Sequence, residues 1–260
     1  PIVRKVTFTG STEVGKELIR QSADTVKKVS MELGGNAPFL VFDDADIDAA
    51  VQGAMVSKFR NAGQTCVCAN RIYVQAGIHD AFVAKLVEAT EAMKVGNGLE
   101  PGVEQGPMID MDAVEKVEEF IADATIQGAT IASGGARHGN GGTYFTPTVI
   151  TGATQSMKFA TEEIFGPLAP VFKFESEEEA LEIANGTPFG LAAYFYTRDM
   201  GRAFRFGEAL EFGLVGLNTG AVSHAEAPFG GVKSSGLGRE GAQEGIEEYL
   251  ETKAFHFGGL

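Results

Sequence analysis

Glu32 and Cys66 lie in sequence contexts where acid–base and nucleophilic chemistry are possible. Glu32 ends an apolar segment and is followed by Gly34 and Gly35, and Cys66 lies 34 positions later in the polar loop NAGQTCVC. A loop cysteine can be a nucleophile, and a carboxylate that ends a buried strand can have a raised pKa and act as a base. Each residue alone also has a commoner interpretation, because free cysteines are mostly buried core residues and a single glutamate is mostly a solvated loop acid.

A third glycine-containing segment precedes both residues. In FTGSTEVG, residues 8–15, a predicted strand is followed by a helix whose first residues are preceded by Gly10 and Ser11. Such a turn leaves backbone N–H groups free at the positive end of the helix dipole, where a phosphate can bind. An ordinary capped turn has the same pattern, so this segment is ambiguous by itself.

The order of five motifs removes much of this ambiguity. The motifs FTGSTEVG, MELGGNAP, FRNAGQTCVCANR, EEIFGPL and APFGGVKSSGLGREG follow one another along the chain. Together they resemble the NAD(P)-dependent aldehyde dehydrogenase family, most closely its succinate-semialdehyde dehydrogenases, and correspond to the C-terminal half of such enzymes. The resemblance implies oxidation of an aldehyde to an acid with NAD or NADP.

The resemblance also implies a role for individual residues. Cys66 corresponds to the nucleophile, its backbone N–H to half of the oxyanion hole, and Glu32 to the general base. The cofactor contacts carried over are Gly10 and Ser11 for the pyrophosphate, Leu33 and Phe165 beside the nicotinamide, and Glu163 for the adjoining ribose. The family's oxyanion-hole asparagine and adenosine-binding strands have no counterpart in these 260 residues.

Arg60 and Ser223 match the positions that bind the substrate carboxylate in succinate-semialdehyde dehydrogenases. A cation and a hydroxyl suit the acid tail of such an aldehyde, although Arg60 near a helix end could equally answer the helix dipole. Glutarate semialdehyde, one methylene longer, is an alternative substrate. The sequence also leaves open a cofactor-free cysteine hydrolase and an inactive chain that only folds and dimerises.

Cys68 has two interpretations. It is a small apolar residue that packs beneath the loop, or it is the thiol that resolves an oxidised Cys66. In an extended C-x-C segment both side chains point the same way, so a disulfide would require some distortion of the loop.

Composition excludes several classes of function. The chain has 21 Lys and Arg against 35 Asp and Glu, a net charge of −14, and no basic cluster, which argues against nucleic acid or an anionic membrane as a partner. No apolar run approaches about 20 residues. With only two cysteines and no signal peptide, a cytoplasmic protein is expected. The four histidines show no ligand spacing, so we expect no metal site: they are His79, His138, His224 and His256.

Alternating strand and helix patterns predict an α/β fold with an open, mostly parallel sheet. By the resemblance, residues 1–33 belong to a Rossmann-type cofactor domain, 34–233 to the catalytic domain, and 234–250 to a segment that returns to the cofactor domain. Strands are expected at 2–9, 26–31, 38–42, 71–75, 192–197 and 213–218, and helices at 11–21, 46–60, 78–93, 113–127 and 176–186. Residues 251–260 are expected to form a strand that pairs with another chain in a homodimer or homotetramer. Pro1 in place of Met suggests a piece of a longer chain.

Overall fold

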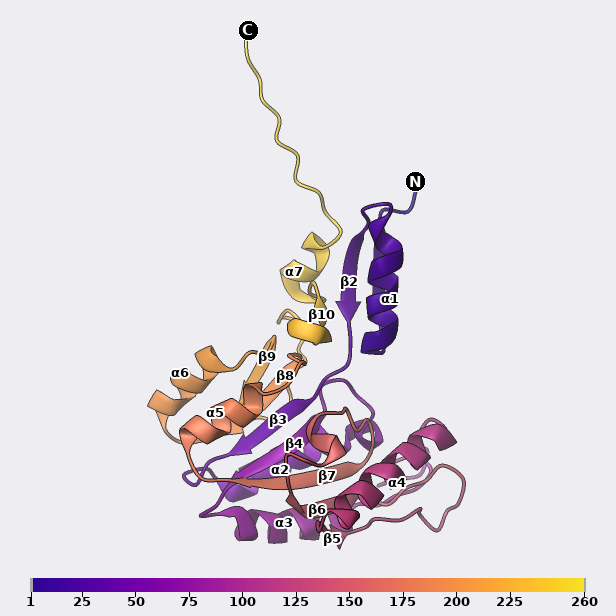
Figure 1. The fold of residues 1–260 in the computed structure, drawn as a ribbon, viewed down its shortest axis with the longest axis vertical. Coiled ribbons are helices and arrows are strands. Elements are labelled where there is room, and N and C mark those ends of the chain that lie inside the picture. Colours follow the sequence, from indigo (N-terminus) through magenta and orange to yellow (C-terminus); the bar gives the residue numbers. More distant parts are fainter. Residues whose placement is uncertain (1, 260) are drawn as a thin grey trace.

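The computed structural model describes residues 2–259 and has two sheets, arranged one above the other in Figure 1. The larger sheet has the order β5-β6-β7-β4-β3-β8-β9, and all of its neighbours are parallel except β5 with β6. The predicted α/β fold with a mostly parallel sheet is therefore confirmed. The strands of this sheet are β3 (Ala37–Val41), β4 (Ala69–Gln75), β5 (Thr130–Ser133), β6 (Thr148–Ala153), β7 (Leu168–Phe174), β8 (Ala192–Tyr196) and β9 (Leu214–Leu217).

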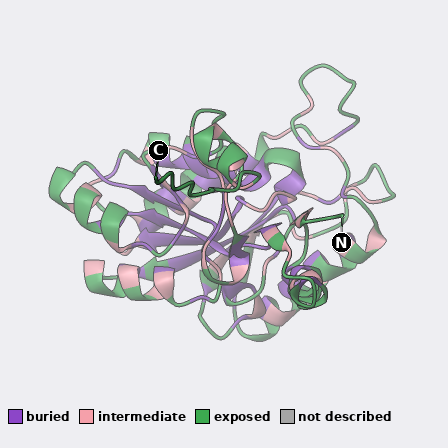
Figure 2. Ribbon diagram, turned by 90° about the horizontal axis from the view of Figure 1, so that it is seen from above, coloured by how far each residue is buried: buried purple, intermediate pink, exposed green. Residues whose placement is uncertain are grey.

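Helices cover both faces of the larger sheet, so that its strands are buried on both sides (Figure 2). On β3, Phe39 and Val41 pack in the core beneath α2 (Ile47–Phe59) and α3 (His79–Glu91). Leu40, which points the opposite way, packs in the core on the other face. The helices on that face are α4 (Met111–Ile126), α5 (Glu177–Asn185) and α6 (Met200–Ala209).

The smaller sheet has the order β1-β2-β10, and the chain connects it to the larger sheet twice, by a short crossing from β2 to β3 and a longer one from β9 to β10. Its strands are β1 (Lys5–Thr9), β2 (Lys28–Glu32) and β10 (Gly236–Leu237), with helix α1 (Thr12–Ala23) beside it and α7 (Ala242–Glu247) after it. Residues 33–36 carry the chain from β2 directly into β3. The loops that precede β3, β4 and β7 therefore lie next to the smaller sheet.

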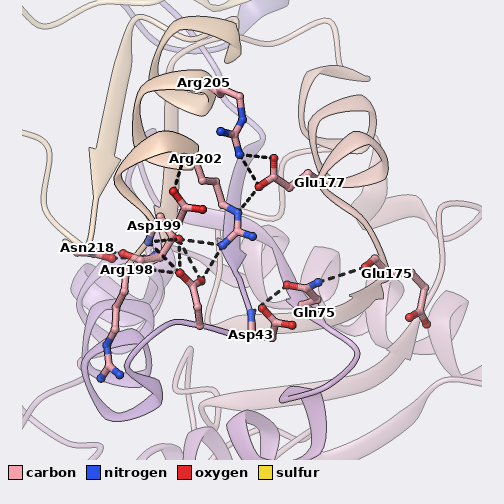
Figure 3. A network of polar contacts seen from close by, with 11 residues as sticks. Asp43, Gln75, Glu175, Glu177, Arg198, Asp199, Arg202, Arg205 and Asn218 are labelled. Atoms are coloured by element: carbon pink, nitrogen blue, oxygen red, sulfur yellow. Dashed lines mark hydrogen bonds and ion pairs between the residues drawn. The ribbon is translucent and has the colours of Figure 1, made fainter.

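A network of ion pairs occupies the opposite, carboxyl edge of the larger sheet (Figure 3). Arg202 of α6 donates to Asp44 after β3 and to Glu177 of α5, at 2.8 and 2.5 Å, and its guanidinium lies 4.3 Å from the ring centroid of Phe42. Burial alone would raise the pKa of Asp44, but hydrogen bonds from Thr197 and backbone N–H groups and the charge of Arg202 outweigh it and lower the pKa. This edge is where open α/β sheets commonly bind ligands, and here side chains of the chain itself fill it.

The strand expected at residues 251–260 stays a prediction, because it requires pairing with another chain. Residues 251–259 form no strand and extend away from the body of the molecule (Figure 1), and Leu260 lies outside the described residues. Within the described chain, no strand pairs with the backbone of this segment.

Sequence patterns failed to predict β5, β6, β7 and α6. The first two of these strands lie toward one edge of the sheet and carry exposed positions, which weakens the apolar signal of a strand.

Candidate functional site

The motif-bearing loops meet at the amino ends of the central strands. Residues 33–36 lead into β3, residues 60–68 into β4, and residues 161–167 into β7. Because these three strands are parallel and adjacent, the loops before them are brought to one edge of the sheet. This edge faces the smaller sheet and is opposite to the ion-pair network of Figure 3.

The loop before Cys66 is held in a strained conformation. Asn61 and Ala62 have φ values of 51° and 55°, in the left-handed region, and Gly63 follows at 74°. A Cβ atom at Gly63 would overlap the backbone carbonyl of Gly166, so the two loops pack backbone against backbone. Strain of this kind persists only where the surroundings hold it, and it is typical of functional loops.

The residues after Cys66 form a turn rather than an extended segment. The N–H of Cys68 donates to the carbonyl of Thr65 at 3.0 Å, and the hydroxyl of Tyr194 donates to the carbonyl of Val67 at 2.7 Å. The thiol of Cys68 is buried and lies 2.8 Å from the hydroxyl of Thr65. The extended C-x-C geometry considered from the sequence is therefore wrong.

Cys66 is half-buried beside the glycine turn. A Cβ atom at Gly35 would lie 2.6 Å from the carbonyl oxygen of Cys66, which shows how closely the two backbones approach. Burial, followed by the charges of Glu163 and Glu32, raises the pKa of Cys66 to about 11. The thiol is therefore protonated near neutral pH and needs a base to become a nucleophile.

Glu32 is a buried carboxyl group without a hydrogen-bond partner among residues 2–259. Its side chain is 4% exposed, and neither carboxyl oxygen has a partner. Burial and the nearby charge of Glu240 raise its pKa to about 8, against the opposing charge of Arg239. An unpaired buried carboxyl group is costly and is characteristic of a group kept for proton transfer.

A pocket of about 460 Å³ opens between α1, the glycine turn and the loop before β7. Its lining includes Ser11, Gly34 and Glu163. The Ser11 side chain accepts from the N–H of Val14 as the N-cap of α1, so its own hydroxyl hydrogen is free to donate. A Cβ atom at Gly34 would lie 3.0 Å from Oε2 of Glu163, and the glycine thus leaves this space open.

These residues fit the pyrophosphate and adjoining ribose of a dinucleotide. The first N–H groups of α1 suit a phosphate, and a carboxylate suits the hydroxyls of a ribose. Glu163 accepts a hydrogen bond from the N–H of Gly35 at 2.9 Å through Oε1, which leaves Oε2 for a ligand. Burial raises the pKa of Glu163, although this N–H and the charges of Lys116 and Lys58 oppose the rise.

The other predicted cofactor contacts do not line this pocket: they are Gly10, Leu33 and Phe165. Gly10 donates its N–H to the carbonyl of Glu32 at 3.0 Å, and Phe165, with φ 53°, adjoins Gly166 at the contact with Gly63. Leu33 packs its side chain against Gly15 of α1. The structure thus gathers these residues around the glycine turn.

Arg60 and Ser223 are both exposed, and no hydrogen bond joins them within the described chain. Arg60 lines a separate pocket of about 260 Å³ with Met55, Val56 and Glu104. The loop that carries Ser223 packs on α2, where a Cβ atom at Gly220 would overlap the backbone of Gly53. Both residues therefore flank the same helix, which ends at the Cys66 loop.

Sequence reasoning missed several residues of the site. Lys16 and Lys116 line the larger pocket, and Arg239 and Glu240 act on the pKa of Glu32. Both lysines are polar positions of amphipathic helices and are indistinguishable there from solvated surface charges. The GRE triplet at 238–240 belongs to the motif APFGGVKSSGLGREG, but the resemblance implies no role for it.

Neither a metal cluster nor a membrane-spanning helix occurs among residues 2–259. No group of three or more His, Cys, Asp and Glu side chains in that range is placed to hold a metal ion. None of the helices described there is long and apolar enough to cross a membrane.

Comparison with known proteins shows which family and structures the chain is similar to. The model of the aldehyde dehydrogenase family matches residues 1–255. The chain is 64% identical over its whole length to the 3-sulfolactaldehyde dehydrogenase of Pseudomonas putida and 59% identical to the glutarate-semialdehyde dehydrogenase of Pseudomonas aeruginosa, and covers 54% of each. It superposes on the crystal structure of succinate-semialdehyde dehydrogenase from Burkholderia pseudomallei with a TM-score of 0.95 and 60% identity, over 96% of this chain and 52% of that one. The chain thus spans about half the length of the relatives it matches.

The raised pKa of Glu32 predicts that this residue destabilises the fold as the pH rises. A group with a raised pKa in the folded state contributes its full stability below its unfolded pKa, about 4.5, and loses it as the pH rises through about 8. We expect Glu32→Gln to be more stable than the wild type by up to about 3 kcal/mol at pH 7, and equally stable at pH 4. Urea unfolding at pH 4, 7 and 9 measures this.

Glu17→Gln is the matched control. Glu17 is exposed, and hydrogen bonds from Gln21 and Arg20 lower its pKa, so its substitution should give a small loss of stability at pH 7 that disappears on acidification. Equal stability of the wild type and Glu32→Gln at pH 7 and 9 would contradict the burial of a costly charge at Glu32.

Proposed function

Because the chain belongs to the aldehyde dehydrogenase family, we propose that it carries the catalytic half of an enzyme that oxidises an aldehyde to an acid with NAD or NADP. The observation that supports this most strongly is that the charges of two carboxyl groups reach Cys66: Glu32, which is buried and unpartnered among the described residues, and Glu163, which lines a pocket. With two free cysteines a reducing compartment is favoured, so we propose a cytoplasmic location, which cell fractionation can check.

In the proposed mechanism Glu32 handles protons for Cys66 and then for water. The ionised carboxylate takes the thiol proton, and the Cys66 sulfur attacks the aldehyde carbon. Glu32 passes the proton on to the aldehyde oxygen, which gives a thiohemiacetal and leaves the carboxylate ionised again. The nicotinamide, when bound, would accept the hydride from the thiohemiacetal carbon. Loss of the hydroxyl proton to solvent would then leave a thioester on Cys66. Glu32 then takes a proton from water, which attacks the thioester and releases the acid while the thiol is restored.

The burial of Glu32 serves both steps. A carboxyl group with a pKa near 8 exchanges its proton near neutral pH, whereas a solvated glutamate would be too weak a base to act on a thiol of raised pKa. The backbone N–H of Cys66 is proposed as one donor to the developing oxyanion. Gly10, Ser11, Leu33 and Phe165 are proposed to hold the cofactor against this group.

The proposed substrate is succinate semialdehyde, with Arg60 and Ser223 binding its carboxylate. Glutarate semialdehyde remains an alternative, and the names of two relatives add that compound and 3-sulfolactaldehyde to the candidates. All three aldehydes end in an anionic group, for which an exposed arginine at the end of α2 is suited. One methylene changes the binding free energy by only about 1–3 kcal/mol, so succinate and glutarate semialdehydes are both testable candidates.

The two cysteines are expected to respond differently to substitution. Cys66→Ala should abolish NAD(P)H formation and any ester hydrolysis, whereas Cys68→Ala should retain both.

Under peroxide, a sulfenic acid on Cys66 would condense with the Cys68 thiol to give a disulfide and water, so dithiothreitol should restore the activity of the wild type but not that of Cys68→Ala. Equal recovery of the wild type and Cys68→Ala would show that Cys68 is a packing residue only.

Retained turnover in Cys66→Ala would refute the assignment of Cys66 as the nucleophile. Full ester hydrolysis by the wild type without NAD(P)H formation would favour a hydrolase.

Arg60→Ala is expected to raise the KM for succinate semialdehyde about 10- to 150-fold and to leave the KM for butyraldehyde nearly unchanged. The reason is the loss of one charge-assisted hydrogen bond, worth about 1.5–3 kcal/mol. Arg198→Ala, an exposed arginine at the opposite edge of the sheet, is the matched control. Equal effects on the two aldehydes would show that Arg60 is structural.

We further propose that residues 251–260 pair with a second copy in a homodimer or homotetramer. The segment is exposed, and its side chains Phe255 and Phe257 are 78% and 70% exposed, with ring centroids 5.6 Å apart. Ending the chain after Leu250 should lower the mass measured by sedimentation velocity to that of a smaller assembly. An unchanged mass would exclude this segment as the contact.

A further inference from the structure

We propose that Asn70 is a positioning residue that fixes Glu163 for the cofactor ribose. The inference rests on the proposed function, because it requires Glu163 to bind a cofactor. Asn70 lies on β4, four positions after Cys66, and is 3% exposed. It does not line the pocket that contains Glu163.

Asn70 binds the backbone on both sides of Glu163. Its Nδ2 donates to the carbonyls of Glu162 and Phe159 at 3.0 and 3.1 Å, and its Oδ1 accepts from the N–H of Ile164 at 2.8 Å. The two residues that flank Glu163 in sequence are therefore held by one side chain. The segment 161–167 belongs to no helix or strand, so its backbone depends on such bonds for its position.

A second buried asparagine joins this clamp to the glycine turn. Asn70 Nδ2 also lies 2.7 Å from Oδ1 of Asn36, so its two hydrogens are shared among three acceptors, and Asn36 Nδ2 donates to the carbonyl of Ala160 at 3.0 Å. Asn36 directly follows Gly35, the residue whose N–H holds Oε1 of Glu163. Arg71, fully buried, fixes the Asn36 carbonyl with two bonds of 3.2 and 2.9 Å.

This arrangement fixes Glu163 from both sides. The Asn70 clamp sets where the glutamate backbone lies, and the Gly35 N–H sets which carboxylate oxygen remains for a ligand. The same buried amides are linked to β4, the strand that directly follows the Cys66 loop. Asn70 therefore keeps the proposed ribose contact in a fixed position relative to the proposed nucleophile without touching either ligand.

The same strand supplies a matched control. Gln75, at the opposite end of β4, also clamps two backbone groups: its Oε1 accepts from the N–H of Asp43 at 2.9 Å, and its Nε2 donates to the carbonyl of Glu175 at 3.2 Å (Figure 3). These bonds lie at the carboxyl edge, away from Glu163. Gln75→Ala thus removes a side-chain clamp of the same kind without affecting the site.

The test compares Asn70→Ala, Asn70→Ser, Glu163→Gln, the double variant Asn70→Ala with Glu163→Gln, and Gln75→Ala. It uses the protein as its gene encodes it, including any residues beyond these 260. The readouts are the KM and kcat for NAD and NADP, NADH binding followed by fluorescence, the melting temperature, and cofactor-independent hydrolysis of p-nitrophenyl acetate by Cys66.

We expect Asn70→Ala to raise the cofactor KM about 5- to 30-fold, the range for loss of one well-formed hydrogen bond, with a smaller effect on kcat and on ester hydrolysis. Asn70→Ser, which keeps a donor and an acceptor, should be intermediate. In the Glu163→Gln background the effect of Asn70→Ala on the cofactor KM should largely disappear, because the two residues act through one contact. Gln75→Ala should leave the cofactor KM unchanged.

Three results would overturn the inference: an unchanged cofactor KM in both Asn70 variants, additive effects of Asn70→Ala and Glu163→Gln, or a rise in KM in Gln75→Ala as large as in Asn70→Ala. Failure of both Asn70 variants to fold, with Gln75→Ala folded, would make the residue structural and would also overturn it. Failure of the proposed function is recognised separately, since Glu163→Gln would then leave cofactor binding unchanged.

Discussion

The backbone contact between Gly63 and Gly166 is the constraint on which the site depends. It presses the loop before Cys66 against the loop that carries Glu163 and Phe165, with no room for a side chain between them. Three consecutive residues, Asn61 to Gly63, take left-handed conformations to make this approach possible. The position of Cys66, the proposed nucleophile, is thus coupled directly to the position of Glu163, the proposed ribose contact.

A second close approach of two backbone segments brings Glu32, the proposed base, toward the Cys66 loop. The crossing from the smaller to the larger sheet passes Glu32 and Gly35, and Gly35 lies against the carbonyl of Cys66. Because Glu32 is buried there without a hydrogen-bond partner among the described residues, its carboxyl group favours the protonated form. The same burial that is expected to reduce stability at high pH suits Glu32 to its proposed role as a base near neutral pH.

The two edges of the larger sheet have opposite characters. At the carboxyl edge, Arg202 forms ion pairs with both Asp44 and Glu177. At the amino edge, a carboxyl group is left unpaired and one oxygen of Glu163 is left unbound by Gly35. The proposed ligand binding at the amino edge departs from the usual rule for open α/β sheets. The smaller sheet provides the reason, because the N-terminus of α1 lies on that side.

The sequence by itself determined the fold class, most central strands and helices, and the order of the chemical motifs, because buried strands such as β3 and amphipathic helices such as α4 have patterns that depend only on nearby residues. Only the tertiary structure decided the electrostatics and the positioning. The pKa values of Glu32 and Cys66 follow from burial by residues distant in sequence, and the effect of Glu240 on Glu32 spans more than 200 positions. Asn70 resembles any polar residue at the start of a strand until the loop 159–164 is seen folded over it. The terminal segment 251–259 shows the opposite case, because its local pattern predicted a strand while pairing requires a neighbour that the described chain does not provide.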